Sequence, residues 1–297
     1  MTIAAREKFD HIFKHVFRTT GLLTIAILAG IFFMLIYNSI AFFLHSSPLD
    51  FITRTQWSPD KSGAAQYGIL PLLISTCFVT VGAMCIAIPL GIGAAAFISE
   101  YAGKRLQNIL KPVIEVMASV PSVAIGFLGI VILGPAIAKI FGLQNGLDAL
   151  NGSVLLAIMS LPTIITIAED AIHAVPQTFR EASYAVGANK WETLTKVTIP
   201  AAAPGLIAAI MLGIGRAIGE TMTVLMATGN AAAIPTNFFD SIRTITATIA
   251  IEMGEVPYQT THYYALFAIA AVLFIITLAV NMIGESLANR LRKFNVS

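Results

Sequence analysis

The sequence predicts an all-α membrane protein with about six spanning helices. Three observations support this fold class. Hydrophobic residues make up 57% of the 297 residues, whereas charged residues make up only 11%. A soluble domain usually carries roughly 25% charged residues, so this composition could not cover a soluble surface. The apolar residues are also gathered in long runs, which short polar segments separate. With a net charge of +2, the chain has no electrostatic basis for binding nucleic acid.

The apolar runs predict the spans in order. The first run covers about residues 21–44 and is too long for an ordinary signal peptide, so we expect an uncleaved spanning helix. Further spans are expected at about 69–98, 109–140, 153–168, 203–228 and 263–287. Pro121 lies inside the third run, where a kink is expected. The segment 229–262 is only moderately apolar and could hold a short or partly inserted helix.

Basic residues predict the orientation of these spans, because Lys and Arg are enriched in cytoplasmic segments. If the N-terminus is cytoplasmic, 13 of the 18 Lys and Arg residues fall on the cytoplasmic side and four on the outer side. We therefore expect a cytoplasmic N-terminal tail over residues 1–19, a transmembrane domain over residues 20–288 and a cytoplasmic C-terminal tail over residues 289–297. A polar loop over residues 173–200 would also be cytoplasmic.

The polar stretch from Glu181 to Pro200 must lie outside the lipid, because its charges and broken backbone could not be satisfied there. Its spacing resembles the EAA loop of ABC importer permeases, which reads E-A-A, three residues, G, nine residues, I, one residue, L-P. The positions that carry the resemblance are Glu181, Ala182, Gly187, Val197, Ile199 and Pro200. Ser183 replaces the second Ala, and Val197 and Ile199 replace Ile and Leu, which are mild changes.

The residues of this loop also fit a docking role. A short helix from Glu181 would present a small face, formed by Ala182 and Ala185, to a partner. Gly187 would let the chain turn, and Trp191 and Leu194 would anchor the second arm. Such a helix in a groove of another protein would transmit rigid-body motion. The alternative is a connecting loop with no partner.

Two charged residues lie inside the fifth run. Arg216 and Glu220 are four residues apart, so they are expected to share a helix face and to pair. Arg216 lies about 20 Å of helical rise beyond the start of its span, a depth at which a charge usually marks an ion or substrate pathway. The guanidinium suits phosphate and other oxyanions, and Thr221 and Thr223 add hydroxyls. A structural ion pair is the alternative. Three glycines keep this helix slim, which allows close helix packing or a lined passage, namely Gly213, Gly215 and Gly219.

Several motifs are absent from the sequence. It contains no G-x-x-x-x-G-K-[ST], so the chain is not expected to hydrolyse ATP. It also contains no G-x-S-x-G and no H-E-x-x-H, and its five His residues have no ligand spacing. We therefore predict no catalytic residue, no metal site and no cofactor in this chain.

Beyond the loop, three stretches resemble the membrane subunits of bacterial phosphate importers. They are SVPSVAIGFLGIVIL (119–133), GRAIGETMTVLMATGN (215–230) and the run ISTCFVT…AIPLGIGAAAFISEY (74–101). The resemblance covers most of the chain from about residue 20 onward. Arg216 and Glu220 match the RA-x-GE element of these subunits, so the resemblance implies a role for both residues in the substrate pathway.

The resemblance implies a type I ABC importer fold in the bacterial inner membrane. It also implies a second, homologous permease subunit, a dimer of a cytoplasmic ATPase that binds ATP and Mg, and an external phosphate-binding protein. The expected function is to form half of the pathway for inorganic phosphate and to couple it to the ATPase through the EAA loop. The alternatives are another oxyanion, molybdate or sulfate, and a self-sufficient secondary transporter or channel.

Overall fold

The computed structural model describes residues 3–59 and 65–294, and helices account for most of them. The first part of the chain comprises α1 (Ile3–Phe43), α2 (Pro48–Thr53), β1 (Trp57–Ser58), β2 (Gln66–Tyr67), α3 (Leu70–Ala96) and the π-helical turn η1 (Phe97–Tyr101). The middle part comprises α4 (Lys104–Ser119), α5 (Ser122–Leu128), η2 (Gly129–Leu133), α6 (Gly134–Phe141), α7 (Ala149–His173) and α8 (Gln177–Ala185). The last part comprises α9 (Lys190–Thr193), η3 (Leu194–Thr198), α10 (Ile199–Gly219), α11 (Met222–Ala227), α12 (Ile245–Glu252) and α13 (Thr261–Phe294). Strands β1 and β2 form one antiparallel pair, with Trp57 opposite Tyr67.

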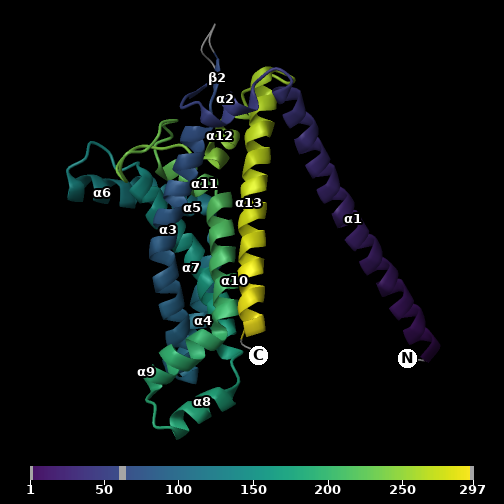
Figure 1. Cartoon of the computed structure of the whole chain (residues 1–297), viewed down its shortest axis with the longest axis vertical. Coiled ribbons are helices and arrows are strands. Elements are labelled where there is room, and N and C mark those ends of the chain that lie inside the picture. Colours follow the sequence, from purple (N-terminus) through teal and green to yellow (C-terminus); the bar gives the residue numbers. More distant parts are fainter. Residues whose placement is uncertain (1–2, 60–64, 295–297) are drawn as a thin grey trace.

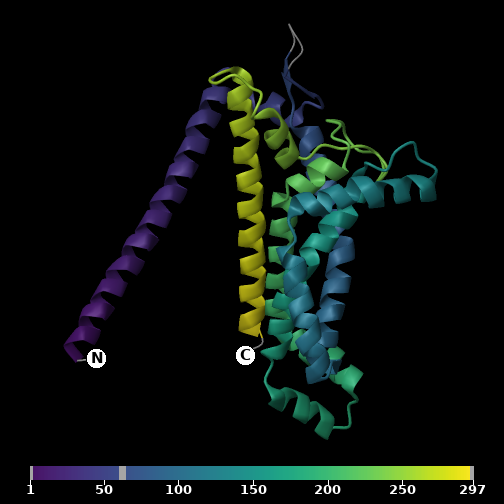
Figure 2. The ribbon, with the colours of Figure 1, turned by 180° about the vertical axis from the view of Figure 1, so that it is seen from behind.

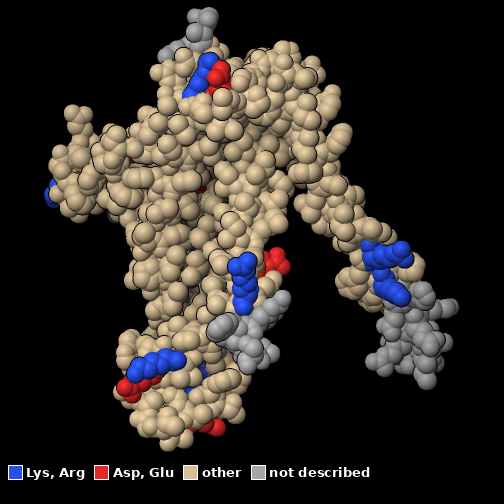
Figure 3. All heavy atoms as spheres, viewed as in Figure 1, with Lys and Arg blue, Asp and Glu red and all other residues tan. Residues whose placement is uncertain are grey.

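Within the described residues, six helices are long and apolar enough to cross a membrane, which confirms the predicted fold class. They are Phe13–Phe43, Leu70–Tyr101, Ser122–Phe141, Ala149–His173, Lys190–Gly219 and Thr261–Leu291. On the face shown in Figure 3, charged side chains lie mainly toward the two ends of the molecule, and the surface between them is almost free of charge. This distribution suits a protein whose middle lies in lipid.

The third predicted span is not one kinked helix. Val120 and Pro121 both adopt extended backbone, which separates α4 from α5. Pro121 cannot donate the backbone hydrogen bond that would continue α4, so the helix ends rather than bends. Figures 1 and 2 show the result: α4 runs along the bundle, whereas α5, η2 and α6 together lie across its long axis.

The centre of the bundle is formed by α3, α7 and α10. Gly213 on α10 and Gly91 on α3 both face Ile164 of α7, and a Cβ at these positions would lie 2.7 Å and 2.6 Å from its side chain. The glycines therefore let three helices approach one buried residue, which is the close packing that the sequence allows at Gly213. A core of buried apolar residues runs through these helices, including Val79, Ala83, Leu156, Ala157 and Ala217.

Helix α1 stands apart from the bundle over most of its length (Figures 1 and 2). It contacts α13, where the Ser39 hydroxyl donates to the carbonyl of Phe267 at 3.1 Å and the rings of Phe32 and Phe274 lie 5.4 Å apart. The helix begins at Ile3 and continues through the predicted N-terminal tail, and α13 likewise continues past residue 288. The backbone marks no boundary between tail and membrane domain, and residues 1–2 and 295–297 of the predicted tails lie outside the described residues.

The two ends of the bundle differ. The loop end, defined by α8 and α9, also holds the N- and C-terminal ends of the chain (Figure 1). The opposite end holds α2, the strand pair and the segment 229–262, for which partial insertion was one expectation. That segment forms a loop followed by the short α12, whose Ile245, Ala247 and Thr248 are fully buried. The backbone N–H of Ile245 donates to Thr76 Oγ1 at 3.1 Å, which ties α12 to α3.

Candidate functional site

The backbone breaks next to the charged pair predicted inside the fifth span. Helix α10 ends at Gly219, and Glu220 adopts extended backbone before α11 begins at Met222. Arg216 and Glu220 therefore do not share a helix face, and within the described residues no ion pair joins them. The predicted i, i+4 pairing is wrong, because the spacing rule applies only while the helix continues.

Arg216 instead contacts α7. Its Nη1 donates a hydrogen bond to the Thr163 hydroxyl at 3.0 Å, and both residues are half-buried. Thr163 follows Pro162 inside α7. In the sequence, the only indication of this partner is a hydroxyl beside a proline in an apolar run. The guanidinium thus has a neutral partner that orients it without cancelling its charge.

The other polar residues predicted for the pathway lie around the helix break, in two different environments. Glu220 is half-buried: Thr223 N–H donates to its carboxylate at 3.3 Å, and the Thr246 hydroxyl donates to its carbonyl at 2.8 Å. The Thr221 hydroxyl donates to the carbonyl of Gly219 at 3.3 Å. Thr223 is fully buried, and its hydroxyl donates to the Ser122 carbonyl at 3.0 Å. In this conformation Thr223 holds α11 against α5 rather than facing an open passage.

The polar loop at the loop end consists of two helical arms joined by a tight turn. Helix α8 forms the first arm, and α9 with η3 forms the second. Gly187 lies between them with φ of +86°, a conformation that a residue with a side chain rarely adopts. The sequence predicts this use of Gly187. The second arm begins with reciprocal hydrogen bonds between Asn189 and Glu192, which form a capping box. Its N-x-x-E spacing is the signal in the sequence that could have predicted it.

The residues that match the EAA pattern differ in exposure. Glu181, Ala182 and Gly187 are exposed on the first arm and the turn, and Pro200 is exposed at the start of α10. Val197 in the second arm and Ile199 at the start of α10 are half-buried. Of the two predicted anchors, Trp191 is exposed, whereas Leu194 is buried against the bundle and is not available to a partner. The exposed surface of this loop therefore belongs mainly to α8 and its turn.

A charged cluster at the opposite end was not foreseen. Glu252 accepts hydrogen bonds from Arg243 at 3.0 Å and Trp57 Nε1 at 3.0 Å, and its carboxylate lies 2.8 Å from the ring of His262. From the sequence alone, Arg243 and Glu252 could be solvated loop charges, meet an external partner or line an outer gate. The contacts instead join the strand pair, the loop before α12 and the start of α13, because residues distant in the chain meet at this end.

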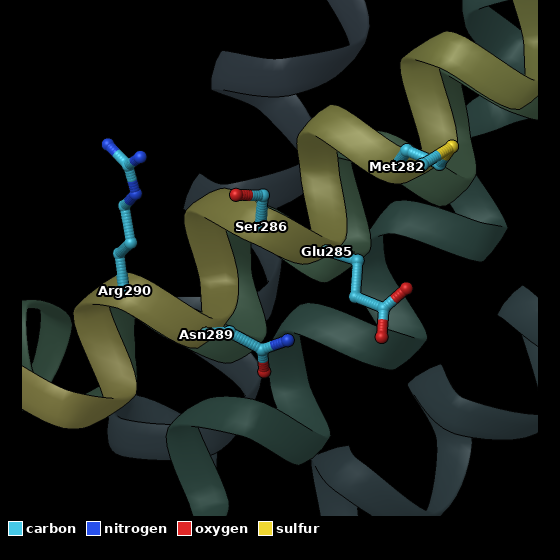
Figure 4. A pocket seen from close by; sticks show the side chains of 5 residues that line it. All are labelled: Met282, Glu285, Ser286, Asn289 and Arg290. Carbon is cyan, nitrogen blue, oxygen red and sulfur yellow. The ribbon is translucent and has the colours of Figure 1, made fainter.

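The structure also contains a shallow pocket near the end of α13, whose lining is shown in Figure 4. Its five lining residues all belong to this helix: Met282, Glu285, Ser286, Asn289 and Arg290. Their side chains point in different directions along one surface, so they do not converge on a ligand. The candidate functional sites of this chain are therefore the α10–α11 break and the polar loop.

The fold and the loop define the class of protein, a permease subunit of an ABC importer. Residues 87–293 match the family described as "Binding-protein-dependent transport system inner membrane component", and the chain belongs to this family. It is thus a transport component and a multi-pass protein of the inner membrane.

Two relatives show how far the likeness extends. The chain is 38% identical over 244 residues to the "Probable ABC transporter permease protein YqgH" of Bacillus subtilis (strain 168), with 82% of this chain and 79% of the relative covered. It is 31% identical over 301 residues to the "Phosphate transport system permease protein PstC" of Mesorhizobium japonicum, with 95% and 90% covered.

Solved structures agree on the fold. One chain of a bacterial ABC transporter involved in the import of alginate superposes with a TM-score of 0.61 at 12% identity, covering 94% of this chain and 99% of that chain. A chain of the MetNI methionine ABC transporter, in an inward-facing conformation, gives a TM-score of 0.58 at 18% identity, covering 75% and 95%. At these identities the likeness concerns the fold alone.

Proposed function

We propose that this chain forms half of the translocation pathway for inorganic phosphate in an ATP-driven importer, and that Arg216 contacts the anion. The observation that carries the proposal is the environment of Arg216. Its guanidinium lies in a span, is half-buried, and hydrogen-bonds to a neutral hydroxyl, with no carboxylate within ion-pair distance among the described residues. A fixed positive charge at this depth is costly unless an anion accompanies it.

The chemistry of this arginine favours an oxyanion. The guanidinium offers five N–H donors in a planar fork, and the hydrogen bond to Thr163 uses only one. The remaining donors match the oxygens of a tetrahedral anion, with which arginine forms strong, charge-assisted hydrogen bonds. Thr221 adds a hydroxyl at the same break. Glu220, a carboxylate beside this path, would disfavour a second anion and would accept from a protonated phosphate oxygen.

Energy would reach this pathway through the loop over residues 173–200. The exposed surface of α8, with Glu181 and Ala182, would dock on a separate cytoplasmic ATPase dimer, because this sequence has no phosphate-binding loop of its own. ATP and Mg would bind to that partner. The loop and both termini lie at one end of the bundle, and the positive residues favour the cytoplasm for that end.

Two further partners complete the proposed complex. A second, homologous permease subunit would supply the other half of the pathway, and an external phosphate-binding protein would deliver the anion at the opposite end. The name of the Mesorhizobium japonicum relative supports phosphate as the substrate. The name of the Bacillus subtilis relative specifies no substrate, so sulfate and molybdate are the competing oxyanions to test.

Uptake into liposomes tests the proposal. The chain is reconstituted with its partner permease, its ATPase and its binding protein, and radiolabelled phosphate, sulfate and molybdate are supplied outside. ATP-dependent uptake of phosphate alone is expected. Equal or greater uptake of sulfate or molybdate would overturn the choice of substrate. Uptake by the single chain without ATP would instead establish a secondary transporter or channel.

A further inference from the structure

Helix α8 is attached to the bundle in an unusual way for a short helix. Its buried residues are Arg180 and Ser183, and both are polar. The large apolar residues of α8 and the turn that follows it are exposed instead: Phe179 by 52%, Tyr184 by 41% and Val186 by 85%. Apolar packing therefore does not hold α8 in place, and its position depends on directional polar contacts.

Arg180 supplies most of these contacts. Its Nε donates to Glu100 Oε1 at 2.8 Å, and its Nη2 lies 2.7 Å from the same oxygen. Nη1 donates to the carbonyl of Val175 at 2.6 Å, and Nη2 donates to the carbonyl of Ile172 at 2.9 Å. The side chains of Arg180 and Glu100 are only 9% and 10% exposed, so solvent screens this pair weakly.

The partners of Arg180 are the ends of two central helices. Glu100 lies in η1, which continues α3, and Ile172 lies in the last turn of α7. The carbonyls in the last turn of a helix lack partners within the helix, so a cation there can donate hydrogen bonds to them. Its charge also interacts favourably with the negative end of the helix dipole. Gln107 of α4 donates to the carbonyls of Ile98 and Ala102, at 2.9 and 3.1 Å, and thereby braces η1 as well.

The second arm of the loop is joined to the same unit. The hydroxyls of Ser183 and Thr193 lie 2.9 Å apart and link the two arms. Lys190 Nζ lies 4.6 Å from the ring centre of Tyr101 in η1, a cation–π contact. Both arms therefore meet the end of α3. Leu194 of the second arm is buried in a cluster that includes Ala96 of α3 and Ile172 of α7, whereas Arg180 makes polar contacts with η1 and with the end of α7.

We propose that Arg180 is a positioning residue that fixes α8 to the ends of α3 and α7, so that a displacement of α8 moves both helices as one body. The inference rests on the proposed coupling role of the loop, and it adds the route by which loop motion reaches the helices. Helix α7 carries Thr163, the partner of Arg216, so this route leads to the proposed anion contact. A planar fork with four contacts fixes an orientation, which a single point charge does not.

The main variant is Arg180→Lys, which keeps the charge but cannot form the fork. A second variant, Glu100→Gln, keeps an acceptor oxygen and removes the opposing charge. The matched control is Lys196→Met, because Lys196 belongs to the same loop and its side chain is 74% exposed in a 3.9 Å pair with Glu192. Each variant is assembled into the full complex, and phosphate uptake and ATP hydrolysis are measured on the same liposomes.

We expect Arg180→Lys to assemble and to hydrolyse ATP, while phosphate imported per ATP falls about tenfold, a common size for coupling between sites. Glu100→Gln should shift the ratio in the same direction, and Lys196→Met should leave it unchanged. Reduced assembly with an unchanged ratio in the assembled fraction would show a merely structural role. If neither variant assembles while the control does, the pair serves assembly and the proposal is overturned.

A spin-label measurement separates this inference from the proposed function. Labels are attached at Val186 in the turn and at Gly93 on α3, where an added side chain meets open space, after Cys77 and Cys85 have been replaced. In the parent complex the distance between the two labels should be the same with and without ATP. In the Arg180→Lys complex the distribution of distances between the labels should be broader. If the distance between the labels in the parent complex changes with ATP, α8 does not move together with α3. That result would overturn the proposed role of Arg180, whether or not the complex imports phosphate.

Discussion

Arg216 of α10 donates a hydrogen bond to Thr163 of α7 at 3.0 Å, across two helices that pack closely beside it. The acceptor is a hydroxyl, so the bond fixes the direction of the guanidinium and leaves its charge unbalanced. The same bond couples the orientation of the arginine to any relative movement of α7 and α10. A charged group held in this way can bind an anion in one arrangement of the helices and release it in another.

Replacing Arg216 by glutamine should abolish phosphate uptake while the complex still assembles. The change removes the fixed charge and several charge-assisted hydrogen bonds, each of which contributes about 1.5–3 kcal/mol. Arg216→Lys should retain part of the activity, because it keeps the charge without the fork. Uptake and assembly are measured by liposome transport and size-exclusion chromatography. Wild-type uptake by Arg216→Gln would assign the residue a structural role.

Thr163 should matter through its hydroxyl. Thr163→Val keeps the shape of the side chain and removes the acceptor. Phosphate uptake should therefore fall by about tenfold, since a hydrogen bond to a charged group contributes about 1.5–3 kcal/mol. Thr163→Ser keeps the hydroxyl and should preserve most of the uptake. The comparison is made on the concentration for half-maximal transport and on the maximal rate. Equal loss in both variants would indicate a packing effect rather than orientation of Arg216.

The sequence predicts the parts of this molecule that depend on local pattern. The six apolar runs, the turn at Gly187 and the close approach at Gly213 follow from composition and from what glycine permits. The break after Gly219 could not be predicted, because Glu220 and Thr221 carry no helix-breaking proline and their conformation depends on contacts such as that between Glu220 and Thr246. The burial of Arg180 could not be predicted for a similar reason. An arginine within a polar loop is expected to be exposed to solvent, and its partner Glu100 is 80 residues away in the chain.

Gly187 should be required for coupling rather than for folding. Its φ of +86° is a left-handed conformation, and an L-residue there costs about 1–2 kcal/mol. Gly187→Ala should therefore shift the turn and lower the phosphate imported per ATP, and Gly187→Trp should lower it further by blocking docking. The effect of Gly187→Ala would come from backbone strain and not from steric overlap, since a Cβ at Gly187 would meet no atom within 4 Å. Helix content by circular dichroism should not change, and normal coupling in Gly187→Trp would remove the docking claim.

The loop before α12 should depend on pH through Asp240. Thr236 donates to its carboxylate from both its backbone N–H and its hydroxyl at 2.7 Å, and Asn237 N–H donates at 3.1 Å. These bonds lower the pKa of Asp240 below its usual value, with the backbone N–H of Thr236 as the largest cause. Because the folded pKa is the lower one, the ionised carboxylate stabilises the loop at neutral pH. This contribution is lost as the pH falls through the lowered pKa.

Amide hydrogen exchange over residues 231–241 checks this dependence. At neutral pH, Asp240→Asn should exchange faster than the parent chain, and the difference should narrow as the pH falls through the lowered pKa of the carboxylate. Exchange rates are corrected for their intrinsic pH dependence. A difference that is independent of pH would show that the charge of Asp240 does not hold the loop.

Replacement of Gly213 should disturb the packing of α10 against α7. A Cβ there would lie 2.7 Å from Cγ1 of Ile164, in the packed contact between α10 and α7. Gly213→Val would force these helices apart, and overpacking of this kind costs about 1–3 kcal/mol. The Arg216–Thr163 bond spans the same contact, so the variant should show both a lower melting temperature of the complex and weaker uptake. Gly215→Ala is the matched control, because its Cβ would meet Asn281 at an ordinary 3.7 Å. A Gly213→Val complex with unchanged melting temperature and uptake would show that the packing of α10 against α7 at this position does not influence anion binding.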